Sequence, residues 1–163
     1  MQNRQFDYER WRKRILEIRD AKTHKEAIEF CELVDRVSDM NHAEVTRTLF
    51  QTLTDKPDHG VKESVYNELG AVDAQLYYQV YLEELPALIK NTQRTKWYVL
   101  LASYPGGELT AEEWDRVISL MRKMPQDTRK AFMDIISTDD FILDNDWAEA
   151  VLEKLQQPEH RSR

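Results

Sequence analysis

The residues that most suggest chemistry are four aspartates in the stretch STDDFILDND, residues 137–146. They are Asp139, Asp140, Asp144 and Asp146, and they surround the apolar residues 141–143. Carboxylates grouped in this way are typical of a calcium loop, of acid–base catalysis, or of a surface that meets a basic protein.

A calcium loop needs oxygen ligands at fixed positions, a glycine at the sixth position and a glutamate at the twelfth. A loop that began at Asp144 would place Glu149 at the sixth position and Leu155 at the twelfth. A loop that began at Asp140 would place Ile142 at the third position, where a ligand is required. We therefore expect no metal site in this stretch.

Other catalytic patterns fail for similar reasons. The four histidines include no pair with the spacing of a zinc site, and the single cysteine, Cys31, cannot complete the deaminase motif that His24 and Glu26 would begin. The adjacent glycines, Gly106 and Gly107, lack the lysine and hydroxyl residue of a phosphate-binding loop. We expect a protein that is not an enzyme and holds no cofactor.

Two compatible interpretations of the aspartates remain. In the structural one, Asp146 caps the last helix, Phe141 and Leu143 pack into the core, and the other three aspartates face water. In the functional one, these three carboxylates steer a basic protein and pair with its lysines and arginines. Glu112 and Asp115 would add charge to the same surface.

Acidic residues gather toward the C-terminus. The net charge of the 163 residues is -7, and residues 108–163 hold thirteen acidic and eight basic side chains. This balance argues against nucleic acid as a ligand, because phosphates would be repelled. The basic run RWRKR, residues 10–14, fits the solvated face of a helix. No apolar run is long enough for a membrane span or a signal peptide, so we expect a cytoplasmic protein.

Apolar residues recur at helical spacing in nearly every segment, which predicts an all-α protein. The predicted helices cover residues 6–20, 24–38, 42–54, 59–70, 74–91, 95–103, 111–124, 127–137 and 146–157. Thr23, Asn41 and Thr110 each precede a glutamate by three residues, as helix-capping residues do. Pro86 is expected to kink or split its helix near Glu84.

After the first helix, the segments group in pairs that begin near residues 23, 58, 94 and 125. A regular spacing of helix pairs, in the thirties of residues, predicts a HEAT- or armadillo-like α-solenoid, with an irregular helical bundle as the alternative. The whole chain, residues 1–163, is expected to form one domain with frayed ends at 1–5 and 158–163.

Three tyrosines on one predicted helix, Tyr77, Tyr78 and Tyr81, face different sides of it. Because one helix has room to bury only some of them, we expect at least one to reach the surface as an anchor for a partner. The alternative is that all three rings fill gaps between helix pairs.

Residues 62–103, KESVYNELGAVDAQLYYQVYLEELPALIKNTQRTKWYVLLAS, resemble the HEAT-like helical immunity proteins of bacterial polymorphic toxin and contact-dependent growth inhibition systems. The similarity lies in VYNELG, the tyrosine-bearing helix, LEELPALI and KWYVLL. It implies a non-enzymatic antitoxin that binds one cognate toxin and blocks it. No binding residue of that family can be matched to this chain.

The expected function is therefore that of an immunity protein against a basic, nuclease-type toxin. The alternative is a helical-repeat adaptor or regulatory subunit. The expected partner is a protein rather than nucleic acid or a membrane, and a monomer is favoured.

Overall fold

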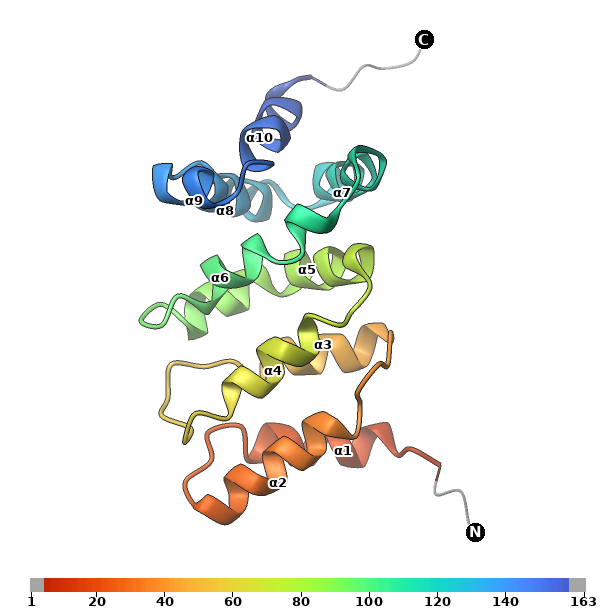
Figure 1. The fold of residues 1–163 in the computed structure, drawn as a ribbon, viewed down its shortest axis with the longest axis vertical. Coiled ribbons are helices and arrows are strands. Elements are labelled where there is room, and N and C mark those ends of the chain that lie inside the picture. Colours follow the sequence, from red (N-terminus) through yellow and green to blue (C-terminus); the bar gives the residue numbers. More distant parts are fainter. Residues whose placement is uncertain (1–4, 159–163) are drawn as a thin grey trace.

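Helix pairs stacked one on another make up residues 5–158, the part of the chain that the computed structural model describes (Figure 1). The first three pairs are α1 (Tyr8–Glu17) with α2 (His24–Asp35), α3 (Ala43–Gln51) with α4 (Lys62–Leu69), and α5 (Ala74–Asn91) with α6 (Trp97–Ser103). A short 3₁₀ helix, Gly106–Glu108, precedes the rest: α7 (Ala111–Lys123), α8 (Gln126–Ile136), α9 (Asp139–Asp144) and α10 (Ala148–Gln156). No strand occurs in these residues.

The pairs contact one another in chain order. Helix α1 packs on α3, α3 on α5, and α5 on both α7 and α8, while α2 packs on α4 and α6 on α8. Helix α10 packs on α7, α8 and α9 and covers the end of the stack at the top of Figure 1. The predicted all-α class with about nine helices is confirmed, and α9 is an additional short helix; the HEAT-like solenoid stays a prediction.

Helix α5 lies at the centre of the core. Tyr77, Tyr78, Val80, Tyr81, Leu82, Leu85 and Leu88 of this helix are all buried. Of the two outcomes predicted for Pro86, a kink or a split, the split does not occur, because α5 runs unbroken from Ala74 to Asn91. Pro86 lies on the exposed side of the helix, while Leu85 and Leu88 beside it are buried against the neighbouring helices.

The helix starts follow the predicted capping residues in two of three cases. Thr110 and Glu113 form a complete capping box at α7, and Thr23 accepts a hydrogen bond from the Glu26 amide at α2. At α3 the prediction is wrong, because His42 is the cap and its Nδ1 accepts from the backbone amide of Glu44. The Asn41 side chain instead accepts from the Asp73 amide and links two loops.

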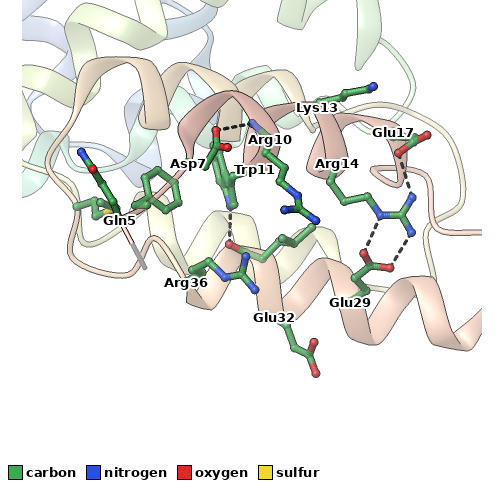
Figure 2. A pocket seen from close by; sticks show the side chains of 13 residues that line it. Gln5, Asp7, Arg10, Trp11, Lys13, Arg14, Glu17, Glu29, Glu32 and Arg36 are labelled. Carbon is green, nitrogen blue, oxygen red and sulfur yellow. Dashed lines mark hydrogen bonds and ion pairs between the residues drawn. The ribbon is translucent and has the colours of Figure 1, made fainter. Parts of the chain in front are cut away.

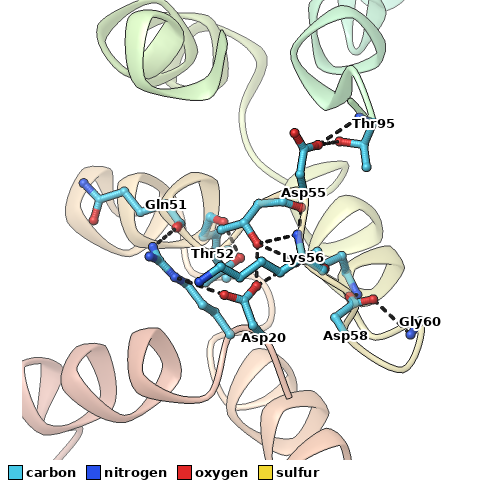
Figure 3. A network of polar contacts seen from close by, with 12 residues as sticks. Asp20, Gln51, Thr52, Asp55, Lys56, Asp58, Gly60 and Thr95 are labelled. Carbon is cyan, nitrogen blue, oxygen red and sulfur yellow. Dashed lines mark hydrogen bonds and ion pairs between the residues drawn. The ribbon is translucent and has the colours of Figure 1, made fainter. Parts of the chain in front are cut away.

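A buried lysine joins the loops at one edge of the stack. Lys62 is only 4% exposed, and its Nζ donates to the Asp20 carboxylate at 3.0 Å, to the Thr54 hydroxyl at 2.8 Å and to the carbonyls of Thr54 and Lys56 at 3.1 and 2.9 Å. Asp20 also accepts a hydrogen bond from Thr54. The α1–α2 loop is thereby attached to the α3–α4 loop (Figure 3).

The same edge continues to the next pair through Asp55. Its carboxylate accepts hydrogen bonds from the amides of Arg94 and Thr95 at 2.9 and 2.8 Å, and from the Thr95 hydroxyl at 2.8 Å (Figure 3). Burial raises the pKa of Asp20 and of Asp55, but these hydrogen bonds and the nearby cations outweigh it, so both pKa values lie below the usual range. Three successive helix pairs are thus held in register by two carboxylates.

Candidate protein-binding surface

The acidic stretch of the sequence forms the short helix α9. Thr138 caps it, accepting a hydrogen bond of 3.3 Å from the Phe141 amide. Asp139 and Asp140 occupy its first turn, where the partial positive charge of a helix N-terminus favours acidic side chains. The helices predicted from the sequence end at residue 137 and resume at 146; the capping threonine and the two acidic residues explain why the stretch between them is helical as well.

Helix α9 buries one side and presents the other to solvent. Phe141 is 5% exposed and its ring lies 5.5 Å from that of Trp147, edge to face. Leu143 is 85% exposed, so the prediction that it packs into the core is wrong. A six-residue helix that rests on α8 and α10 has only one buried side, and Phe141 occupies it.

Asp146 does not cap the last helix, contrary to the prediction. The residue before α10 is Trp147, it makes no capping hydrogen bond through its side chain, and Asp146 is exposed. The Trp147 indole stacks on Trp114 with ring centroids 4.5 Å apart. We attribute the chain direction at this turn to that stacking, since Asp146 contributes no bond to it.

The five predicted acidic residues divide into two groups. Asp139, Asp140 and Asp144 are exposed on α9, and their side chains form no ion pair or hydrogen bond with any residue that the structure describes. Glu112 and Asp115 lie on α7 and are partnered, Glu112 by Arg116 at 3.1 Å and Asp115 by Lys154 at 2.8 Å. The uncompensated charge is therefore on α9.

We define the α9 surface as Asp139, Asp140, Leu143 and Asp144. Leu143 follows Asp140 by three positions and Asp139 by four, and Asp144 follows Asp140 by four, so Leu143 has carboxylates beside it on the exposed side of the helix. An apolar side chain surrounded by free carboxylates offers a partner both contact area and charge. The arrangement is chemically suited to a basic protein surface that carries an apolar recess.

The three tyrosines of α5 cannot anchor a partner, because all three are fully buried. Their hydroxyls donate to carbonyls of α6: Tyr77 to Leu101 at 2.8 Å, Tyr78 to Ala102 at 3.0 Å and Tyr81 to Tyr98 at 2.7 Å. Burial also raises the pKa of each phenol above its usual value. The prediction that one reaches the surface is wrong, since α5 is packed by helices on several sides.

Other aromatic residues are more accessible than those of α5. Tyr66 of α4, Trp97 of α6 and Tyr104 are half-buried, with the Tyr66 ring 6.0 Å from Trp97 and 6.3 Å from Tyr104. Leu100 of α6 is 45% exposed. The signal in the sequence was the run WYVLL, because five consecutive apolar residues on a short helix cannot all face the core.

Residues 5–158 contain neither a metal-binding cluster nor a membrane-spanning helix. Within that range no group of three or more histidine, cysteine or acidic side chains is arranged to hold a metal ion. No helix in the same range combines the length and the apolar character that crossing a bilayer requires.

Comparisons with known proteins return no similarity. The chain matches no protein-family model, no curated protein and no solved structure.

Proposed function

We propose that this chain is a non-enzymatic immunity protein, which binds a basic toxin domain through the α9 surface and blocks it. The observation that carries the proposal is the exposure of Leu143 among three carboxylates that have no counter-charge within the described residues. The resemblance of residues 62–103 to helical immunity proteins supplies the class of partner.

Binding would proceed in two stages that depend on different residues. The carboxylates of α9 attract a basic protein at long range and raise the association rate. Leu143 then contributes buried apolar area, which slows dissociation. The helices beneath keep the surface in place, since α9 rests on α8 and α10. Inhibition follows from occlusion of the toxin, and no bond is made or broken.

Rescue of intoxicated cells tests this function. A toxin domain encoded beside the gene for this chain is expressed from an inducible promoter, with and without the chain, and viable cells are counted. We expect the chain to restore growth. Loss of viability despite soluble, folded chain at equal or greater abundance than the toxin would contradict the proposal.

A matched pair of variants locates the binding surface. Asp139, Asp140 and Asp144 are changed together to Asn, and a control chain carries Glu9→Gln, Asp35→Asn and Glu63→Gln. The control residues are also exposed and form no ion pair with a described residue, and both variants lose three negative charges. We expect rescue to weaken only in the α9 variant. Equal rescue by both chains would show that the α9 carboxylates do not contribute to binding.

A further inference from the structure

The two ends of the helix stack are covered differently. Helix α10 covers one end, whereas the outer side of the α1–α2 pair carries no further helix in the part of the chain that the structure describes (Figure 1). A groove runs between α1 and α2, with a volume of about 1330 Å³. Phe6, Trp11, Leu33 and the partly exposed Met40 supply its apolar lining.

Acidic and basic side chains are balanced around this groove. Asp7, Glu17, Glu29 and Glu32 lie against Arg10, Lys13, Arg14 and Arg36. Although the whole chain carries a charge of -7, this end of the stack therefore offers no net repulsion to an identical face.

The register of the two helices is fixed by two contacts. The Trp11 indole donates to the Leu33 carbonyl at 2.8 Å, and the Arg14 guanidinium bonds both Glu29 oxygens at 2.7 and 2.8 Å. Figure 2 shows the consequence along the groove: Arg14 lies level with Glu29, and Asp7 lies level with Arg36. Each of these two levels, meaning positions that face each other across the groove, carries one acidic and one basic residue.

Arg10 and Glu32 follow the same pattern between those levels, and neither pairs with the other (Figure 2). Both are exposed, and neither forms an ion pair with a described residue. Together with Asp7, Lys13 and Arg36, which also form no ion pair with a described residue, they are the charges of the groove that remain free for an external partner.

We propose that the outer face of the α1–α2 pair is the interface of a two-fold symmetric dimer of this chain. A two-fold axis parallel to the groove lays α1 of one copy along α2 of the other without shifting the levels. Opposite charges then meet at these three levels, with Arg10 facing Glu32 of the second copy and the reciprocal pair formed by symmetry. The two apolar groove floors face each other between these pairs.

This dimer goes beyond the proposed function and leaves it intact. The α9 surface lies at the opposite end of the stack, so each copy could still meet a basic partner (Figure 1). The sequence alone favours a monomer. The self-complementary order of charges is visible only in the structure, where α1 and α2 lie side by side.

Charge reversal at the interface gives a sharp test. Sedimentation velocity, from about 5 to 500 µM protein, is measured for the unmodified chain, for Arg10→Glu, for Glu32→Arg and for an equal mixture of these two variants. We expect the unmodified chain to dimerise. Each single variant should have a dimer dissociation constant raised about tenfold or by a larger factor, because both symmetric contacts become repulsive.

The mixture distinguishes this interface from a general effect of charge. A heterodimer of the two variants regains both pairs of opposite charge, so the mixture should dimerise again, as should the double variant Arg10→Glu/Glu32→Arg. Glu63→Arg, on the exposed side of α4, is the control and should dimerise as the unmodified chain does. A chain that stays monomeric throughout, or a dimer that neither single variant weakens, would overturn the proposal.

Discussion

The ammonium group of Lys62 lies 3.0 Å from the carboxylate of Asp20, although the two residues are 42 positions apart in the sequence. This contact attaches the first helix pair to the second at a point where the lysine is almost completely removed from water. Charged groups are rarely buried unless their hydrogen bonds are satisfied, and Lys62 meets that condition with acceptors from three residues.

Removing this lysine should destabilise the protein strongly. In Lys62→Met, Asp20 loses the nearer of its two counter-ions and two loop carbonyls lose their donor, so we expect the free energy of unfolding to fall by about 2–4 kcal/mol. Chemical denaturation measures the loss. Lys56→Met is the matched control, because its side chain is exposed, and it should change stability by less than about 0.5 kcal/mol. Equal stability of the two variants would show that the network is dispensable.

The same carboxylates predict how stability depends on pH. Because the pKa values of Asp20 and Asp55 lie below the usual value in the folded protein, these groups bind fewer protons when folded than when unfolded. Their contribution is complete above the unfolded pKa and is lost as the pH falls through the folded one. We expect the free energy of unfolding to decline from about pH 5 downward, and less steeply in Asp20→Asn/Asp55→Asn.

Denaturation curves collected at intervals between about pH 6 and pH 3 would measure that slope. Asp35→Asn provides the comparison, since Asp35 is exposed and makes no ion pair with a described residue. If the double variant and the unmodified chain lose stability in parallel, the two carboxylates do not carry the acid sensitivity.

The tyrosines of α5 should affect folding and leave binding unchanged. In Tyr77→Phe or Tyr78→Phe, a buried carbonyl of α6 loses its hydrogen bond, which should cost about 1–2 kcal/mol of stability. Thermal unfolding followed by circular dichroism measures the cost. Below the unfolding temperature, both variants should bind the toxin domain with the affinity of the unmodified chain. A loss of affinity without a loss of stability would show that these tyrosines contribute to binding.

Two adjacent glycines should respond very differently to alanine. A methyl group at Gly106 would overlap the Trp147 indole, whereas one at Gly107 would meet nothing within 4 Å. Because overpacking forces neighbouring groups to move, Gly106→Ala should lower stability by about 1–3 kcal/mol. Calorimetric melting of the two variants side by side would detect the difference. Similar melting temperatures would mean that the stacked Trp114 and Trp147 can shift without cost.

Local signals in the sequence predicted the helices well. Thr110 and Glu113 formed the capping box that their spacing indicated, and the apolar stripes gave α5 its full length from Ala74 to Asn91. Such features depend on residues within a turn or two of one another, which the sequence displays directly. The helix Asp139–Asp144 was missed because it is shorter than two turns and holds only one buried residue.

The candidate binding surface was only partly predictable. The exposure of the α9 carboxylates follows from their chemistry, because acidic side chains that lie close together in the sequence favour water, and they are exposed. The burial of Tyr77, Tyr78 and Tyr81, in contrast, depends on how many helices surround α5, which is a property of the whole stack. The Leu143 error has the same origin, because nothing local indicates which side of a short helix meets its neighbours.

The central proposal, that α9 binds a basic protein, is tested most directly by the association rate constant between this chain and a toxin domain encoded beside its gene. At low salt, changing Asp139, Asp140 and Asp144 to Asn should slow association about tenfold or more, and the difference should shrink as salt screens the charges. The control chain with Glu9→Gln, Asp35→Asn and Glu63→Gln should associate as fast as the unmodified chain. An unchanged rate for the α9 variant at low salt would contradict the claim.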